Sequence, residues 1–367
     1  MSQLIADGPR PRSRRASRHL WLAVVAALAL LVAACGDDDD DASTTTTSGT
    51  EDTTTTTPED GDTDEGDSEE ESSAGGETVA VEHALGTTEV NPDEIERITS
   101  ASVTLTGHML IVDAPVVASM ASGPGGPLAD ENGFFNQYAA VAVERGVEAI
   151  PGPEVNVEAI AATDPDLIIG SAVGGDAIDE SIYDQLSQIA PTLGFDYSAT
   201  SWQDATTEIA TILGLEDAAA AAIGEFDALV AETSEAITVP AEPASAMVLS
   251  EDGANVFTPE SPRGQLLQSL GFIMAELDEA SAAEVEGGNR SDIVPYSQES
   301  LVAFLPGKTV FLVFADDSRI EEAAATPLGE TDPFTEGRVY ALGFESFRLD
   351  YYSATLAVER IAAALGS

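Results

Sequence analysis

The chain is poor in cysteine, histidine and basic residues. Its 367 residues include one cysteine, three histidines and 14 lysines or arginines, against 66 aspartates or glutamates. Because the only cysteine is Cys35, the chain after it contains no disulfide and no thiol nucleophile. After Cys35 only two histidines remain, His83 and His108. They are too few for a site that binds zinc or manganese directly, and we expect both to be structural. The acidic excess repels nucleic acid and anionic lipid, so neither is an expected partner of the surface.

Motifs of common exported enzymes are also lacking. There is no G-x-S-x-G elbow, and the segment Gly123-Pro124-Gly125-Gly126-Pro127 is too rich in proline for a phosphate-binding loop. After Cys35 no apolar run is long enough to cross a membrane. We therefore do not expect an enzyme, and we expect no catalytic residue, no bound metal and no cofactor of the protein's own.

The N-terminal segment has the composition of an export signal. Five arginines between residues 10 and 18 precede an apolar run from Leu20 to Val32, which at about 13 residues is shorter than the ~20 that span a bilayer. Val32-Ala33-Ala34-Cys35 resembles the bacterial lipobox, whose cysteine becomes an acylated N-terminus. We expect residues 1–35 to be a lipoprotein signal peptide and Cys35 to anchor the protein outside the cytoplasm at the cell membrane. An uncleaved anchor helix is the alternative.

Residues 36–76 form an acidic linker. They consist almost wholly of Asp, Thr, Ser, Glu and Gly, with aspartates at 37–41 and threonine runs at 44–47 and 53–57. Without large apolar residues the segment cannot offset its ordering entropy, so we expect it to be disordered and to provide reach.

Residues 77–367 alternate strand and helix patterns in two series, which indicates an α/β fold with two lobes, 77–215 and 239–367. In the first lobe we predict strands at 116–118, 147–150 and 167–170 and helices at 103–111, 157–162 and 178–189. In the second, the pattern places strands at 244–249, 309–314 and 339–342 and helices at 265–270, 299–305 and 351–365.

One helical pattern lies between the two series. Apolar residues recur at helical spacing over 217–237, with Gly224 as the weak point, and a helix of this length measures ~31 Å. We predict an interlobe helix at 216–238; a crossover helix within one continuous sheet is the alternative.

Several segments resemble the substrate-binding proteins of importers for ferric siderophores and cobalamin, and within that class the binders of ferric enterobactin. They are Ser102–Gly107, Asn156–Ile169, Ser171–Asp176, Tyr183–Thr192, Thr258–Ser261 and Phe347–Ala354. The resemblance implies two Rossmann-like lobes joined by one long helix, with the ligand cleft between the lobes. It also implies a monomer that captures a ferric siderophore, of an enterobactin-like catecholate type, and delivers it to the permease of an ABC importer. Haem or cobalamin as ligand, or ligand sensing without transport, are the alternatives.

A ferric tris-catecholate is anionic and aromatic, so arginines and aromatic rings should hold it, with the iron held by the siderophore. The resemblance places Arg348 and Arg290 at basic cleft positions and Phe257 where a tryptophan is expected, while Pro127 stands where a first-lobe arginine is expected. Two more arginines and two tyrosines are further candidates for ligand contact: Arg263, Arg319, Tyr296 and Tyr351.

The resemblance also implies surface carboxylates that pair with arginines of the permease. On the first lobe it points to Asp184 or Glu180, and on the second lobe we choose Glu260. The alternative is that these are ordinary acids near helix N-termini, where the helix dipole favours negative charge.

Overall fold

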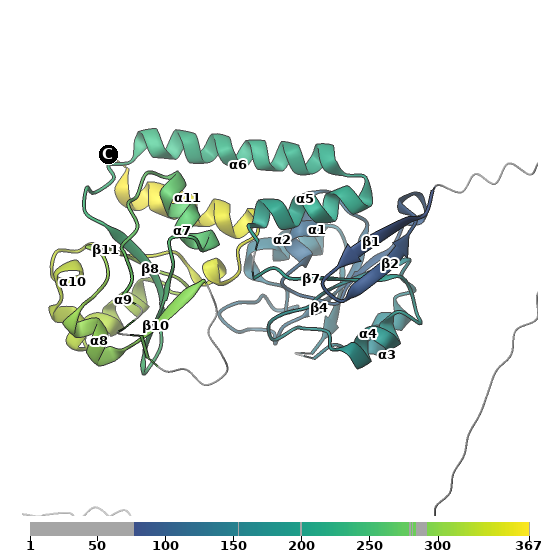
Figure 1. The fold of residues 1–367 in the computed structure, drawn as a ribbon, viewed down its shortest axis with the longest axis horizontal. Helices are drawn as coiled ribbons and strands as arrows, with labels where there is room; N and C mark the ends of the chain where they lie inside the picture. Colours follow the sequence, from purple (N-terminus) through teal and green to yellow (C-terminus); the bar gives the residue numbers. More distant parts are fainter. Residues whose placement is uncertain are drawn as a thin grey trace, which may run out of the picture. The chain divides into compact units, whose positions relative to one another are not determined.

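Two α/β lobes make up the part of the chain that the computed structural model describes (Figure 1). The described residues are 77–152, 154–198, 200–278, 280, 282–283 and 292–366, and all belong to one unit, Glu71–Ser367. The predicted signal peptide, the lipidation site Cys35, the linker and Arg290 lie outside the described residues.

The first lobe is built on a five-stranded parallel sheet in the order β5-β4-β3-β6-β7. Its strands are β3 (Ile98–Ser100), β4 (Val116–Ala121), β5 (Glu148–Pro151), β6 (Leu167–Ser171) and β7 (Thr192–Phe195). Its helices are α1 (Thr106–Ile111), α2 (Asn136–Glu144), α3 (Val157–Ala162), α4 (Glu180–Leu186) and α5 (Trp202–Leu213). The strand order reverses between β3 and β6, and in such sheets ligands bind outside the carboxyl ends at this point.

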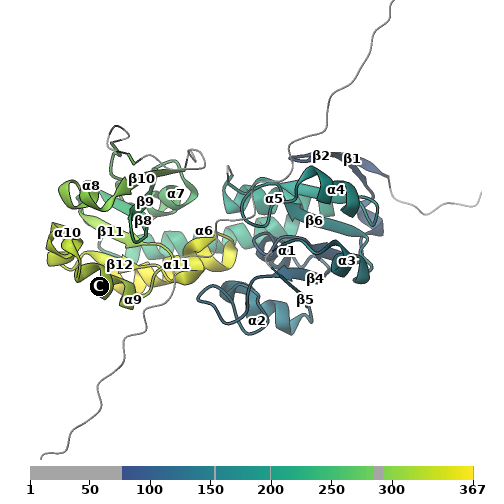
Figure 2. The ribbon, with the colours of Figure 1, turned by 90° about the horizontal axis from the view of Figure 1, so that it is seen from below.

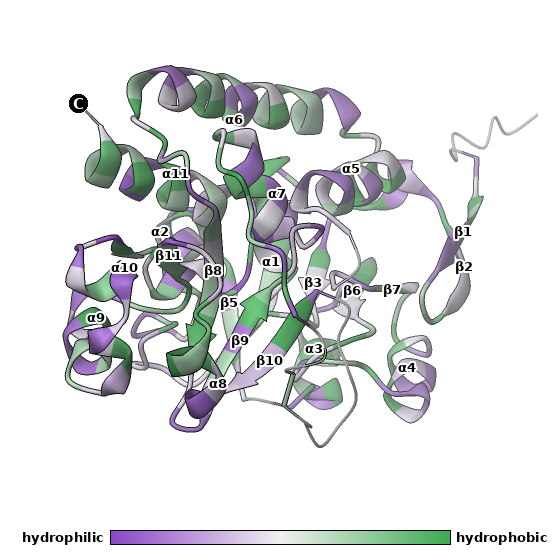
Figure 3. Cartoon of the chain, turned by 60° about the vertical axis from the view of Figure 1, so that its left-hand side comes forward, coloured by the Kyte–Doolittle hydropathy of each residue, from purple (hydrophilic) through white to green (hydrophobic). Residues whose placement is uncertain are grey.

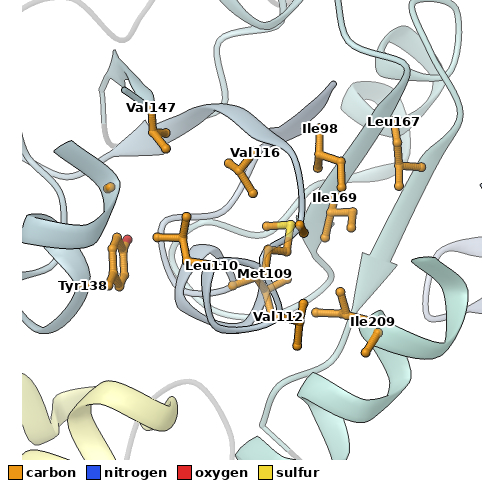
Figure 4. Close-up of a cluster of buried hydrophobic side chains, with 14 of the residues drawn as sticks. Ile98, Met109, Leu110, Val112, Val116, Tyr138, Val147, Leu167, Ile169 and Ile209 are labelled. Atoms are coloured by element: carbon orange, nitrogen blue, oxygen red, sulfur yellow. The ribbon is translucent and has the colours of Figure 1, made fainter. Parts of the chain in front are cut away.

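The core of the first lobe explains why these segments are strands and helices. Figure 4 shows residues from the sheet, from α1 and from the flanking helices meeting in one apolar cluster, among them Ile98, Val116, Leu167, Ile169, Met109, Leu110, Tyr138 and Ile209. Because β3 and β6 are buried on both faces, they consist of continuous runs of buried residues. A two-stranded antiparallel hairpin, β1 (Val79–His83) and β2 (Gly86–Val90), precedes this sheet, and its Thr88 donates to the carbonyl of Thr192 at 2.9 Å.

The second lobe contains a mixed sheet in the order β10-β9-β8-β11-β12. Strands β8 (Ala244–Leu249), β11 (Thr309–Leu312) and β12 (Val339–Ala341) are parallel, whereas β9 (Gly253–Phe257) and β10 (Ile293–Ser297) add as antiparallel neighbours. The helices are α7 (Pro262–Ser269), α8 (Gln298–Ala303), α9 (Asp317–Ala324), α10 (Asp332–Thr335) and α11 (Tyr351–Leu365). This lobe also contains the short 3₁₀ turns η3 (Pro327–Glu330) and η4 (Phe344–Phe347), and the first lobe contains η1 (Pro92–Glu94). Figure 3 shows outer helices that carry both hydrophilic and hydrophobic residues.

One long helix joins the lobes. Helix α6 runs from Glu216 to Ala236, 21 residues, and lies along both lobes above α5 and α11 (Figures 1 and 2). It contacts α5 of the first lobe and α11 of the second, and α11 in turn contacts α1 and α2. Two helices therefore connect the lobes, one by the chain and one by packing.

The predicted fold class, two α/β lobes joined by one long helix, is confirmed. The differences are local. The helix predicted at 103–111 begins only at Thr106, because Ser102 to Leu105 form a turn in which the Ser102 hydroxyl accepts from the Leu105 amide at 3.3 Å. None of the described helices combines the length and the apolar character that a membrane crossing requires.

Candidate cleft between the lobes

A pocket lies where the two lobes face each other, with an empty volume of about 490 Å³ that is open to solvent. The first lobe lines it with residues that follow β3 and β7, among them Thr104, Tyr197 and Trp202. The second lobe lines it with Arg263 at the start of α7 and Arg348 just before α11. The pocket thus lies at the carboxyl edge of the first sheet, where the strand order predicts a binding site.

Arg348 reaches from the second lobe to the first. Its guanidinium carbon lies 4.2 Å from the centroid of the Phe347 ring and 5.5 Å from that of Tyr197. Both distances are within the range of cation–π attraction. Arg348 is partly exposed and, within the described part of the chain, forms no ion pair with an acidic side chain. Its charge therefore faces the pocket with aromatic faces beside it.

The loop that carries Arg348 is held in place by Arg263. The Arg263 side chain is buried and donates to the carbonyls of Ser346 at 3.3 Å and Phe347 at 2.5 Å. Its guanidinium carbon lies 4.5 Å from the centroid of the Phe257 ring. On the other side of the loop, the Ser353 hydroxyl donates to the Arg348 carbonyl at 2.7 Å. Two of the predicted ligand residues, Arg263 and Phe257, thus contact each other, and Arg263 fixes the loop that carries Arg348.

The three predicted aromatic residues are not among those that line the pocket. Phe257 is 6% exposed, packed in the second-lobe core and covered by Arg263. Tyr296 is 3% exposed in the core around Met247, with its hydroxyl donating to the Asp278 carbonyl at 3.1 Å. Tyr351 stacks edge-on against Trp202 and donates to Glu225 of α6. Phe257 and Tyr296 therefore have little surface left for a ligand. Tyr351 is partly exposed, and its direct contact with the ligand stays a prediction.

The remaining predicted residues lie elsewhere. Arg319, on α9, pairs with Glu322 at 2.9 Å and donates to the Leu249 carbonyl at 3.3 Å. The three acids proposed for docking are exposed: Glu180 and Asp184 on α4 of the first lobe, and Glu260 before α7 of the second. Arg290 is outside the described residues, so its place in the cleft stays a prediction.

His108 is a buried structural residue, although it borders the pocket. Its Nδ1 lies 2.8 Å from the Thr206 hydroxyl, which ties α1 to α5. Burial lowers the pKa of His108 to about 4, so the ring is neutral at physiological pH. Among the described residues, no group of three or more histidine, cysteine or acidic side chains is arranged to hold a metal ion.

Sequence reasoning missed Tyr197, which lines the pocket beside Arg348. Burial raises the pKa of Tyr197, the Arg348 charge lowers it and the Asp176 charge raises it further. Its hydroxyl donates to Asp176 at 3.4 Å. The available signal was its position two residues after the buried strand β7, at the edge where parallel sheets carry ligand-binding residues.

The two lobes, the single connecting helix and the pocket at the carboxyl edge define a periplasmic-binding-protein architecture. Residues 101–293 match the sequence profile of the family described as "Periplasmic binding protein", so the chain belongs to that family.

The chain is also similar to individual proteins whose names state a ligand or whose structures are solved. The chain is 44% identical over 271 residues to the "Ferric enterobactin-binding periplasmic protein FepB" of Escherichia coli O6:H1, covering 73% of this chain and 85% of that protein. It is 30% identical over 197 residues to the "Probable siderophore-binding lipoprotein YfiY" of Bacillus subtilis, covering 53% and 57%. Among solved structures it resembles holo-ViuP, with 28% identity, a TM-score of 0.70 and coverage of 79% and 95%. PiaA of Streptococcus pneumoniae TIGR4 in complex with ferrichrome, at 19% identity, a TM-score of 0.59 and coverage of 78% and 98%, shares the fold.

Proposed function

We propose that this protein is an extracytoplasmic binding protein that captures a ferric siderophore and delivers it to an ABC importer. The observation that carries the proposal is Arg348, whose guanidinium faces the interlobe pocket beside two aromatic rings. In a chain with 14 basic and 66 acidic residues, a cation at this position serves an anionic, aromatic ligand. The 44% identity to a ferric-enterobactin-binding protein supports the same ligand class.

The cleft draws its positive charge from the second lobe. The first lobe has two basic residues, and both are engaged: Arg97 donates to the carbonyls of Thr163 and Asp164, and Arg145 pairs with Asp113. Arg348, together with the proposed Arg290, would neutralise one side of the complex. The siderophore holds the iron, so the protein needs no ligand atom on the metal, and we assign no reaction to it.

The test is intrinsic fluorescence quenching across ferric catecholates, ferric hydroxamates, haem and cobalamin. We expect the tightest binding for a ferric catecholate. A charge-assisted contact contributes ~1.5–3 kcal/mol, so Arg348→Ala should weaken that binding about tenfold to a hundredfold. A neutral ferric hydroxamate should lose little.

Arg97→Ala is the control, because Arg97 is engaged by carbonyls of the first lobe away from the cleft. If Arg348→Ala binds every ferric siderophore as tightly as the parent, the arginine does not clamp the ligand. Binding of haem or cobalamin alone would contradict the siderophore class. Co-purification with a permease separates transport from ligand sensing without transport.

The proposal includes a monomer that is anchored to the cell membrane through Cys35. The name of one relative, a siderophore-binding lipoprotein, supports such an anchor. Mass spectrometry of the N-terminal peptide of the mature protein shows directly whether Cys35 carries a lipid. Several acyl chains anchor a protein stably, whereas a single chain binds only marginally.

A further inference from the structure

Two of the sequence segments that carry the family resemblance meet at one carboxylate in the first lobe. Ser102 follows β3 and Asp176 follows β6, the two strands between which the strand order reverses. The Ser102 hydroxyl donates to Asp176 Oδ2 at 2.5 Å, and the amide of Thr104 approaches the same oxygen at 3.4 Å. The other oxygen, Oδ1, receives the Tyr197 hydroxyl at 3.4 Å. The carboxylate is therefore held at the place where the first lobe meets a ligand.

The surrounding loop is shaped to admit this arrangement. Gly174 has a φ of +86°, and a Cβ at that position would lie 2.0 Å from the Tyr197 hydroxyl and 3.5 Å from Asp176 Oδ1. A residue with a side chain would displace Tyr197 and strain the backbone. Gly174, Gly175 and Ala177 are exposed and Asp176 is partly exposed. The carboxylate lies next to the pocket, because it contacts Thr104 and Tyr197, which both line it.

Asp176 has acceptor capacity left over. A carboxylate offers about four acceptor sites. The bonds to Ser102 and Thr104 use one oxygen, and among the described residues Oδ1 has only the long contact to Tyr197. Within the described part of the chain, no lysine or arginine forms an ion pair with it. The cleft therefore has a cation on its second-lobe side, Arg348, and a carboxylate on its first-lobe side, separated by the Tyr197 ring.

We propose that Asp176 is a specificity-determining residue that accepts a hydrogen bond from an N–H group of the ferric siderophore, an ammonium or an amide. The inference rests on the proposed function, since it concerns how the same cleft selects among ferric complexes. A complex that turns an anionic oxygen toward the first lobe meets a like charge there, whereas one that turns an N–H group toward it gains a charge-assisted bond. The preferred ligand is thus polar across the cleft, anionic toward Arg348 and a donor toward Asp176.

The test is a double-mutant cycle between the protein and two pairs of synthetic ferric tris-catecholates. The first pair differs by one ammonium group on the backbone, and the second by methylation of the backbone amide nitrogens. Dissociation constants are measured by fluorescence quenching for the parent and for Asp176→Asn. We expect the parent to prefer the donor-bearing member of at least one pair, and Asp176→Asn to reduce that preference about tenfold. The pair that responds identifies ammonium or amide as the donor.

Asp196→Asn is the charge-matched control. Asp196 is exposed, precedes Tyr197 and accepts from the amide and hydroxyl of Ser198, so its substitution removes the same charge without touching the Ser102–Asp176 network. Ser102→Ala, which removes the 2.5 Å bond, serves as a second variant if Asp176→Asn unfolds. Its expected result is a smaller loss of the same preference, because the carboxylate remains but is less firmly held.

Two results overturn the inference. If Asp176→Asn changes both members of each pair by the same factor, the carboxylate only shapes its loop. If Asp196→Asn has the same effect as Asp176→Asn, the effect is one of overall charge. Both leave the proposed function intact. Failure of the parent to bind any ferric complex overturns the proposed function, and the inference falls with it.

Discussion

Asp350 shows how a single buried group connects the two lobes. It lies at the start of α11 and is 1% exposed. The Asp350 carboxylate accepts from the Ser353 amide at 2.8 Å, and the Ser353 hydroxyl accepts from the Asp350 amide. Across the lobe boundary it accepts from Gln137 of α2 at 3.3 Å, and Gly107 of α1 lies against it. Burial raises the pKa of Asp350 to about 6, and hydrogen bonds from Ser353 and Gln137 only partly oppose this.

Asp350 contributes more to the stability of the folded protein at low pH than at neutral pH. Since the pKa is about 6 in the folded protein and near 3.8 in the unfolded chain, the folded state holds the proton more tightly. The contribution of Asp350 to the free energy of unfolding is therefore largest below pH 4, falls as pH rises toward 6 and stays low above it. The cost at neutral pH is at most about 3 kcal/mol.

We predict that Asp350→Asn stabilises the protein at pH 7.5, by about 1–3 kcal/mol. Asparagine still accepts from the Ser353 amide through its oxygen. Its N–H group takes the place of Asp350 Oδ2, to which Gln137 Nε2 now donates, so the Gln137 amide must turn over to offer its buried Oε1, which has no hydrogen-bond partner among the described residues. Urea unfolding at pH 7.5 and pH 4 measures the difference between variant and parent. The gain should vanish at pH 4; a variant that is less stable at pH 7.5, or a gain independent of pH, contradicts the assignment.

His108 acts in the opposite sense over a similar range of pH. Its pKa is lowered to about 4 by burial, against 6.5 in the unfolded chain, so its contribution to stability is complete above pH 6.5 and is lost as pH falls toward 4. The two buried groups offset each other in the parent protein. For this reason the comparison of Asp350→Asn with the parent, in which the His108 term cancels, is the informative measurement.

Residue chemistry was only partly predictable from the sequence. Arg348 was placed in the cleft by resemblance, and the pocket geometry agrees. The sequence did not predict that Phe257 and Tyr296 are buried, because an aromatic ring near a loop faces the core or the cleft according to what packs on it. Arg263 packs on Phe257, and Tyr296 lies in the same core cluster as Met247. Tyr197 and Asp176 acquire their importance from partners far away in sequence, namely Arg348 and Ser102.

At the scale of elements, the packing of α1 against α11 depends on a glycine. A Cβ added at Gly107 would lie 2.3 Å from Asp350 Oδ2 and 3.2 Å from the Tyr138 ring. Both neighbours are fully or nearly fully buried and cannot give way cheaply. The close approach of the two helices, and with it the contact between the lobes, therefore requires the missing side chain.

We predict opposite effects of the same substitution in two helices. Gly107→Ala should lower the free energy of unfolding by about 1–3 kcal/mol, because overpacking outweighs the gain in helix propensity. Gly224→Ala is the matched control: it lies in the exposed interior of α6 with no atom within 4 Å of the added Cβ, and should raise stability by roughly 0.5–1 kcal/mol. Denaturant unfolding of both variants decides the matter, and equal effects at the two sites would be evidence against a packing role for Gly107.

Elements with a strong apolar period were predictable. The strand Ala244–Leu249, the helix Val157–Ala162 and the helix Tyr351–Leu365 have the predicted bounds. The antiparallel strands β9 and β10 were not predicted, because Pro295 interrupts one and a polar Asn255 the other, and their pairing is set by neighbours in the sheet. The hairpin β1–β2 was not predicted either, because its residues are mostly exposed and show no clear apolar pattern.

For the whole molecule, the proposed docking to a permease involves both lobes. Asp184 and Glu260 are exposed on different lobes, so reversing both charges should impair uptake of the ferric complex while leaving its dissociation constant unchanged. The double variant Asp184→Arg, Glu260→Arg is compared with Glu232→Arg, which changes another exposed acid, on α6. Glu180→Arg tests the neighbouring candidate on α4. Normal uptake by the double variant would remove these carboxylates from the interface.

The connection between the lobes has a consequence for how an importer distinguishes loaded from empty protein. Helix α6 spans both lobes without a loop, and α11 packs back across the boundary onto α1 and α2. A continuous helix bends elastically, so the separation of carboxylates on the two lobes changes little when the cleft is filled. In the docking that we propose, an empty copy then presents nearly the same surface as a loaded one and competes with it for the transporter. The rate of uptake consequently depends on the fraction of copies that carry cargo, as well as on their number.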